Sequence, residues 1–334
     1  MSGELPSVLV VAGPTASGKS ALALALAVEF GGCVINADSM QVYRELEILT
    51  ARPGPDSLAA APHRLYGTLS GREVCSAGRW CDLARQAIEA ALQAGQLPIL
   101  AGGTGLYLRA LEEGLADLPA IPPAVRVAAR RRQAELGGPA FHEALAARDP
   151  MMAARLHPND SQRLVRAWEV LEATGRSLAD WQAESRESAR ADAAPYRFLR
   201  LTLMPERTLL YAACDRRFEA MMTAGALEEV RRLRALELDP SLPVMKALGA
   251  RPLLRHLAGE TGLEAAVTVG QQETRRYAKR QLTWLRTQVG AGAEPKAPSV
   301  RTISSSWAIE EQYSERLNAE IFPKIRDSLL TPPG

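Results

Sequence analysis

Short apolar runs alternate with stretches of helical periodicity along the N-terminal third of the chain. Three runs, Val8–Ala12, Cys33–Ala37 and Leu97–Ala101, are apolar almost throughout, which is typical of strands buried on both faces. Between the second and third runs, Arg79–Ala94 carries apolar residues at three- and four-residue spacing and stops at Gly95, the pattern of an amphipathic helix. This alternation predicts an α/β fold in which helices flank a parallel sheet.

The strand pattern disappears from Leu118 to Ala194, where Arg, Ala, Glu and Leu recur at helical spacing between Pro and Gly breaks. Phe198–Leu203 returns as a strand, and Pro205 starts another helical pattern. We therefore expect a helical insertion within the α/β core. The expected parts are the first part of the core (1–117), the helical insertion domain (118–196), the second part of the core with basic helices (197–293) and a C-terminal tail (294–334).

The tail is rich in Ser, Pro and charged residues, so we expect it to be partly disordered. Trp307 and Ile321 are its candidate docking points.

A phosphate-binding loop connects the first strand to the helical pattern Ala21–Phe30. It reads Gly13, Pro14, Thr15, Ala16, Ser17, Gly18, Lys19, Ser20, the G-x-x-x-x-G-K-[ST] pattern in its strand-loop-helix setting. Backbone N–H groups and the helix N-terminus attract an anion, Lys19 adds a full positive charge, and Ser20 can hold Mg²⁺. The chain is therefore expected to bind a polyphosphate. Kinases, NTPases and transferases that release diphosphate all use such a loop.

Two polar residues follow the other strands. Asp38 ends the second run, where it can accept a proton, bind Mg²⁺ through water or cap the following turn. Thr104 follows Gly102 and Gly103 at the end of the third run, where its hydroxyl can reach a phosphate or merely cap a helix. That turn lacks the acidic residue with which NTPases hold Mg²⁺, which disfavours a hydrolase. Because the carboxyl ends of parallel strands share one edge, Asp38, Thr104 and the phosphate loop should converge.

Composition and charge indicate which class of partner the chain binds. The chain has 334 residues, 47% of them hydrophobic, and a net charge of +2. Residues 1–112 carry eight Lys and Arg against ten Asp and Glu, so the positive excess lies in the remainder, in clusters at Arg126–Arg132, Arg231–Arg234 and Arg275–Arg286. Each cluster alone reads as a solvated helix face, but together with the phosphate loop they favour a nucleic-acid partner.

The N-terminus and the cysteines indicate a cytoplasmic protein. Glu4 and Pro6 interrupt the stretch before the phosphate loop, so we expect neither a signal peptide nor a membrane anchor. The four cysteines show neither CxxC nor zinc-site spacing and are expected to be thiols in a reducing compartment. They are Cys33, Cys75, Cys81 and Cys214.

Two helical stretches carry candidate RNA contacts. One begins at Pro158 and places Gln162, Arg163, Arg166 and Glu169 on adjoining rows, which without further information is also the pattern of solvated surface. The other, Glu273–Arg286, sets Arg276 and Arg280 on one row among Tyr277 and Trp284. Arginine beside aromatic rings suits phosphates and unstacked bases.

With these residues in place, the chain resembles the tRNA dimethylallyltransferases, also called tRNA isopentenyltransferases, of the bacterial type. The resemblance covers residues 8 to 286 and rests on a series of blocks in the family's order. They are the phosphate loop, Asn36–Arg44, Gly102–Tyr107, Asn159–Arg163 with Arg166–Val170, and Gln281–Arg286.

The resemblance implies a P-loop NTPase-like core that transfers a dimethylallyl group from dimethylallyl diphosphate to N6 of the adenine 3′ to the anticodon of a tRNA. It implies that Asp38 accepts the amine proton, that Lys19 and a Mg²⁺ on Ser20 stabilise the departing diphosphate, and that Thr104 positions the bridging oxygen. The resemblance also implies a set of tRNA contacts. They are Asp38, Ser39, Met40, Gln41, Thr104, Arg126, Gln162, Arg163 and Arg166. A basic surface facing RNA favours a monomer that recognises the anticodon stem-loop.

Three other functions are possible for a chain with this phosphate loop, and two positions differ from the family's pattern. A kinase of a small metabolite has no use for the basic insertion, an isopentenyltransferase of free nucleotides is expected to lack the Asn159–Glu169 block, and a non-catalytic RNA-binding module has no need of Lys19 and Asp38. Arg64 stands where relatives usually have a second histidine, and Ala250 where they commonly have tyrosine, which leaves local packing or RNA contacts there open.

Overall fold

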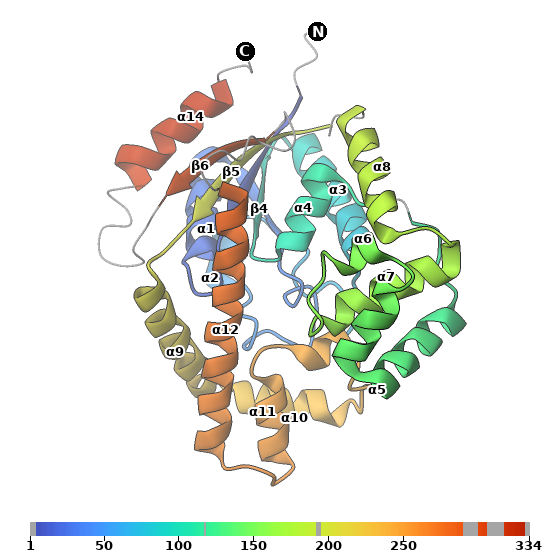
Figure 1. Ribbon diagram of the computed structural model, residues 1–334. Coiled ribbons are helices and arrows are strands. Elements are labelled where there is room, and N and C mark those ends of the chain that lie inside the picture. The colour runs from blue at the N-terminus through green and yellow to red at the C-terminus, as the bar shows by residue number, and fades with distance from the viewer. Residues whose placement is uncertain (1–4, 117, 192–194, 290–299, 306–316, 331–334) are drawn as a thin grey trace. The chain divides into compact units, whose positions relative to one another are not determined.

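The computed structural model describes residues 5–116, 118–191, 195–289, 300–305 and 317–330. The chain forms two compact units, of which unit 1 comprises Met1–Glu112 and Ala194–Gly334 and unit 2 comprises Glu113–Ala193. Unit 1 contains a six-stranded sheet in the order β3-β2-β4-β1-β5-β6, with every neighbouring pair parallel (Figure 1). The predicted α/β fold is therefore confirmed.

The strands are β1 (Ser7–Ala12), β2 (Gly32–Asn36), β3 (His63–Arg64), β4 (Leu97–Gly102), β5 (Arg197–Leu203) and β6 (Val300–Ser305). The helices of unit 1 are α1 (Lys19–Phe30), α2 (Pro55–Ala60), α3 (Ala77–Gln93), α4 (Gly105–Glu113), α9 (Arg207–Thr223), α10 (Ala226–Ala235), η1 (Pro243–Lys246), α11 (Ala250–Leu257), α12 (Leu263–Val289), η2 (Leu317–Ile321) and α14 (Phe322–Leu330). Those of unit 2 are α5 (Pro123–Ala146), α6 (Pro150–Ala153), α7 (Ser161–Thr174) and α8 (Leu178–Ala191).

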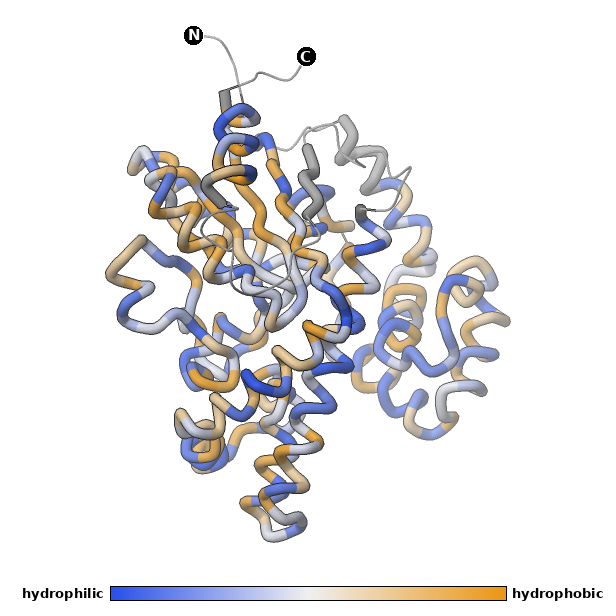
Figure 2. The backbone as a smooth tube through the Cα atoms, turned by 90° about the vertical axis from the view of Figure 1, so that its left-hand side faces the viewer, coloured by the Kyte–Doolittle hydropathy of each residue, from blue (hydrophilic) through white to orange (hydrophobic). Residues whose placement is uncertain are grey.

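Each face of the sheet packs against its own helices. Along β1, Val8 and Val10 belong to a core with α3 and α4, whereas Leu9 and Val11 belong to a second core with α1 and α14. This separation follows from the two-residue period of a strand, which turns successive side chains to opposite faces. Because both faces are covered, the strands are hydrophobic along most of their length (Figure 2).

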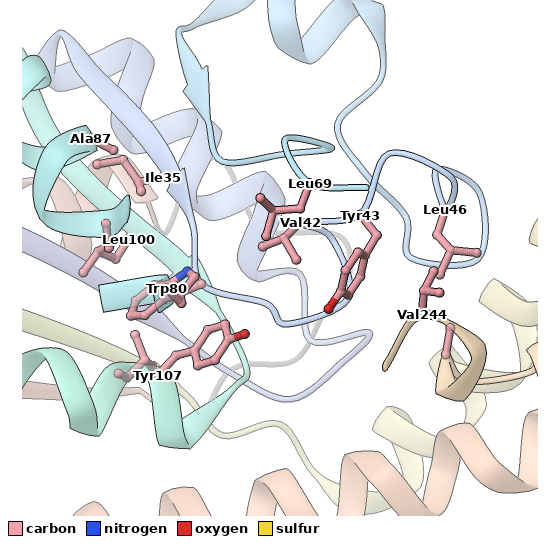
Figure 3. Packing of buried hydrophobic residues seen from close by; sticks show 14 of the residues in the cluster. Ile35, Val42, Tyr43, Leu46, Leu69, Trp80, Ala87, Leu100, Tyr107 and Val244 are labelled. Carbon is pink, nitrogen blue, oxygen red and sulfur yellow. The ribbon is translucent and has the colours of Figure 1, made fainter. Parts of the chain in front are cut away.

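An aromatic pair fixes the end of β2. The ring of Trp80 on α3 stacks on Tyr107 of α4 with centroids 4.5 Å apart (Figure 3). Trp80 Nε1 donates a 3.0 Å hydrogen bond to the carbonyl of Asn36, the last residue of β2. The buried indole N–H is thereby satisfied, and the turn that follows β2 starts from a fixed point.

Unit 2 has a hydrophobic core of its own. Phe141 of α5 packs against Trp168 of α7 with ring centroids 5.3 Å apart, and both are buried. The guanidinium groups of Arg132 and Arg148 each lie 4.8 Å from the Trp168 ring centroid. Helix α5 is kinked at Gly137, whose φ of 74° is left-handed.

The structure adds two strands that the sequence analysis missed. The predicted runs match β1, β2, β4 and β5 to within one residue at either end. Strand β3 has only two residues, too few to show a period, and β6 lies within the expected tail. In that tail, α14 covers the sheet and Ile321 is buried, while Trp307 lies outside the described residues. The chain leaves unit 1 after Glu112 and returns at Ala194. Among the described helices, none is long and apolar enough to cross a membrane.

Candidate active site

The phosphate loop leaves the N-terminus of α1 open. Ala16 and Gly18 have left-handed φ values of 62° and 82°, and Gly18 caps the helix without any side-chain hydrogen bond. The first N–H groups of α1 therefore remain available to an anion, and the Ser20 hydroxyl beside them is exposed. Ser17 Oγ is buried with no hydrogen-bond partner among the described residues.

Two cations converge on the loop. Lys19 Nζ donates to the Pro14 carbonyl at 3.4 Å, and burial lowers the pKa of Lys19 to about 8 against the opposing charge of Asp38. Arg217 of α9 donates to Thr15 Oγ1, and burial lowers the pKa of its guanidinium as well. Both side chains are half-buried, and two partly desolvated cations with one nearby carboxylate favour an anionic ligand, which supplies the missing countercharge.

Arg217 is not among the site residues predicted from the sequence. One signal pointed to it, since Leu210, Cys214, Phe218 and Met221 form the buried stripe of α9 and Arg217 falls within that stripe. An arginine among buried apolar positions needs a partner. The arginines of the three basic clusters, in contrast, can be explained as residues of a solvated helix face.

The turn after β2 holds Asp38 in place. Asn36 Oδ1 accepts a 2.8 Å hydrogen bond from Asp38 N, and Asn36 Nδ2 donates to the carbonyls of Asp38 at 3.0 Å and Leu65 at 3.1 Å. Asp38 Oδ1 accepts from Met40 N at 2.9 Å. Its Oδ2 has no hydrogen-bond partner within the described part of the chain. The carboxylate thus caps the turn with one oxygen and has the other available for chemistry.

Thr104 lies directly against this turn. Its Oγ1 accepts a 3.0 Å hydrogen bond from Ser39 N, and its own N–H donates to the Ala37 carbonyl at 3.3 Å. At Gly102, a Cβ would collide with the Ala37 carbonyl, so only glycine lets the two turns approach this closely. The expected convergence at the sheet edge therefore occurs: β1, β2 and β4 are adjacent, and the turns that follow them carry Lys19, Asp38 and Thr104.

Helix α12 forms the back of this arrangement. Gln281 accepts a 2.8 Å hydrogen bond from Thr15 N in the phosphate loop and donates one of 2.8 Å to the Gly103 carbonyl. The hydroxyl of Tyr277 interacts with Thr104, and burial raises the pKa of this phenol. Residues along α12 also line a groove of about 510 Å³. Its lining residues are Arg276, Lys279, Arg280, Thr283, Trp284 and Thr287.

The other candidate tRNA residues of unit 1 lie in the turn after Asp38. Ser39 and Met40 are half-buried. Gln41 is 9% exposed, and its amide donates to the carbonyls of Thr50 at 2.8 Å and Ala51 at 3.0 Å, so this side chain holds a neighbouring loop. An RNA contact of the Gln41 side chain stays a prediction.

Unit 2 carries the remaining candidates. Arg126 is exposed on α5, and Gln162 and Arg163 are exposed on α7. Arg166 is half-buried and forms a 3.4 Å ion pair with Glu169. Their exposure leaves these side chains accessible to a large anionic partner, and their roles in RNA binding stay predictions.

The two departures noted in the sequence lie in different surroundings. Arg64 is exposed on the edge strand β3 and interacts with the Cys33 thiol. Ala250 is fully buried at the start of α11, next to Gly249, where a Cβ would meet the Phe218 ring.

Comparison with known proteins identifies the relatives of this chain. The model of the family described as IPP transferase matches residues 41–288. The tRNA dimethylallyltransferase of Paramagnetospirillum magneticum is 56% identical over 325 residues, which cover 97% of this chain and 98% of the relative. That of Rhodospirillum centenum is 58% identical over 287 residues, or 85% of this chain and 90% of the relative.

Solved structures agree with these relatives. The full-length tRNA isopentenylpyrophosphate transferase of Bacillus halodurans is similar with a TM-score of 0.67 and 30% identity, over 97% of this chain and 96% of that one. A eukaryotic dimethylallyltransferase captured while acting on tRNA gives a TM-score of 0.78 and 25% identity, over 98% of this chain and 80% of that one.

Proposed function

The chain belongs to the IPP transferase family and is a tRNA dimethylallyltransferase, and from this premise we propose how its residues divide the reaction. The enzyme transfers a dimethylallyl group from dimethylallyl diphosphate to the adenine 3′ to the anticodon and releases diphosphate. The convergence of Lys19, Asp38 and Thr104 on one sheet edge carries the proposal.

The phosphate loop receives the diphosphate of the donor. Negative charge accumulates on the bridging oxygen as its bond to the allylic carbon breaks. The open N–H groups of α1, Lys19 and Arg217 stabilise this charge, since all three surround the loop. Thr104 lies at the adjoining turn and positions the bridging oxygen.

Asp38 deprotonates the nucleophile. The N6 amine of adenine forms a bond to the allylic carbon while the carbon–oxygen bond breaks, the diphosphate leaves with the electron pair, and the surplus amine proton moves to Asp38. Oδ2 is the oxygen we assign to this step, because Oδ1 accepts the N–H of Met40. The adenine must leave the stack of the anticodon loop to reach the carboxylate.

We propose Mg²⁺ as the cofactor, with Ser20 as its protein ligand. The exposed Ser20 hydroxyl lies at the start of α1, beside the open N–H groups. The described residues contain no cluster of three His, Cys, Asp or Glu that could hold a metal alone. This suits Mg²⁺, which commonly binds through one or two protein oxygens, substrate phosphates and water. When bound, the ion stabilises the charge of the departing diphosphate.

The partner is the anticodon stem-loop of a tRNA. We assign contacts to the turn after β2, to the basic groove of α12 and to the helical insertion (118–196), because each presents accessible polar or cationic groups. The proposed residues are Asp38, Ser39, Met40, Gln41, Thr104, Arg126, Gln162, Arg163, Arg166, Arg276 and Arg280. The enzyme is proposed to act as a cytoplasmic monomer. The four free cysteines suit a reducing compartment.

One assay tests the proposal. The protein is incubated with dimethylallyl diphosphate, Mg²⁺ and either bulk tRNA or AMP, and the products are weighed by mass spectrometry. We expect one dimethylallyl group on an adenosine of tRNA and none on AMP. Prenylation of AMP would favour the rival function, and release of phosphate without transfer would exclude the mechanism.

A further inference from the structure

We propose that Gln281 is a positioning residue for the transfer reaction, which aligns the phosphate loop with the turn that carries Thr104. The proposal rests on the proposed function, because it concerns how the bound diphosphate is aligned with Thr104 and Asp38. Gln281 itself contacts no reacting atom in this assignment.

Both the oxygen and the nitrogen of the Gln281 amide form hydrogen bonds. Its oxygen accepts from Thr15 N at 2.8 Å, and its nitrogen donates to the Gly103 carbonyl at 2.8 Å. The side chain is buried, at 6% exposed. A single planar amide therefore links two turns whose residues are far apart in the sequence, and in a buried site each bond lost would leave a backbone group unpaired.

Gln281 connects the two turns beyond the point at which strands β1 and β4 stop pairing. Strands β1 and β4 are paired up to Ala12 and Gly102, so the ladder fixes the chain as far as these residues. Beyond them, in the part of the chain that the structure describes, no ladder hydrogen bond joins the phosphate loop to the turn that carries Thr104. Gln281 spans this gap, and a Cβ at Gly103 would collide with its amide nitrogen, so the glycine is required for the contact.

Neighbouring turns of α12 reinforce the same contact. Tyr277, one turn earlier, interacts with Thr104, and the Trp284 ring, one turn later, lies where a Cβ of Gly105 would be. Residues four and three positions apart lie on one helix face, so Tyr277, Gln281 and Trp284 form a single row against the two turns. The rigid helix thereby sets the separation of donor and Thr104.

The test replaces Gln281 by residues of similar size. Gln281→Met removes both hydrogen bonds and retains most of the volume. Because a misplacement of about 1 Å can cost about 100-fold in rate, we expect kcat to fall by roughly 10- to 100-fold. The KM values for dimethylallyl diphosphate and tRNA should change by less than about threefold, since Lys19, Arg217 and the RNA-facing residues remain.

The variant Gln281→Glu distinguishes a positioning role from a purely structural one, because only a positioning role makes its kcat depend on pH. The new carboxylate accepts from Thr15 N but cannot donate to the Gly103 carbonyl, whereas its protonated form can do both. The kcat of Q281E relative to the unchanged enzyme should therefore rise as the pH is lowered. The matched control is Gln271→Met on the same helix, where the amide donates to Glu219 at 3.1 Å and lies apart from both turns. This variant should keep its kcat.

Thermal unfolding of each variant is measured in parallel, and kinetics are run well below the lowest midpoint. A kcat of Q281M within twofold of the unchanged enzyme would overturn the proposal, as would a loss confined to the donor KM or an unaltered pH profile for Q281E. Failure of the unchanged enzyme to modify tRNA would instead refute the proposed function, so the two failures are distinguishable.

Discussion

In the proposed mechanism Asp38 caps a turn with one carboxylate oxygen and accepts a proton with the other, and a substitution can separate these two tasks. In Asp38→Asn the amide oxygen still accepts from Met40 N, so the turn is preserved. The amide cannot take a proton from the adenine amine. We expect the single-turnover rate of transfer to fall by about 10²- to 10⁴-fold with tRNA affinity nearly unchanged. Asp82→Asn, at an exposed position on α3, is the control. Turnover near normal in D38N would refute the assignment of the base.

The lowered pKa of Lys19 predicts that binding of the donor depends on pH. With a pKa of about 8 in the free enzyme, Lys19 loses its charge as the pH rises through this value. A bound diphosphate favours the charged form and raises the pKa. Calorimetric titration with dimethylallyl diphosphate should therefore show log Kd increasing with pH, with a slope approaching about one between the two pKa values.

Lys19→Arg tests the origin of that slope. A guanidinium stays protonated throughout this range, so the slope should vanish. Lys246→Arg, an exposed lysine on η1, should retain it. A slope that persists in K19R would assign the titration to another group.

At the scale of residues, the sequence predicted the groups that directly follow the strands. Lys19, Asp38 and Thr104 could be named because a sheet brings the ends of its strands to one edge. Arg217 and Gln281 could not, since no local pattern states which loop a distant helix will face.

The proposed role of the groove on helix α12 in RNA binding can be tested at Arg280. Arg280 lines this groove, and its guanidinium lies 5.5 Å from the centroid of the Tyr277 ring. In Arg280→Ala we expect weaker tRNA binding and a salt dependence whose slope is smaller by about one, because one phosphate contact is lost. The kcat at saturating tRNA should persist.

Filter binding at several salt concentrations measures both quantities. Arg255→Ala is the control, since Arg255 on α11 is exposed and paired with Glu260, which follows the helix. Equal salt slopes for R280A and the unchanged enzyme would remove α12 from the RNA interface.

At the scale of elements, periodicity located the buried strands and the long helices but not the edges of the sheet. Strand β6 has the sequence V-R-T-I-S-S, in which the apolar residues Val300 and Ile303 do not alternate with polar ones, and its Ser- and Pro-rich flanks suggested a tail. Edge strands bury less, so their patterns are weaker.

The C-terminal segment is part of the structure of unit 1. Ile321 and Ile325 are 4% and 0% exposed in the core beneath α14. Deleting residues 294–334 also removes β6 from its partner β5. We expect the free energy of unfolding to fall by at least about 3 kcal/mol, the value of burying two such side chains. Urea denaturation measures the loss, and Lys324→Ala, exposed on α14, should leave the midpoint unchanged. An unchanged midpoint after deletion would show that α14 adds no stability.

At the scale of the whole molecule, the sequence predicted an α/β core interrupted by helices because the strand signal stops and returns. The hydrophobic pattern contains this information, since unit 2 buries Phe141 and Trp168 in its own core. The residues at which one unit gives way to the other carry no comparable signal.

The Thr15–Gln281 bond joins residues 266 positions apart, which has a consequence for biosynthesis. The loop proposed to hold the donor leaves the ribosome before the helix that supports it, since α12 follows β5 and α9 in the chain. A nascent chain therefore carries an unfinished donor site until α12 has been synthesised. Prenyl transfer must await that helix.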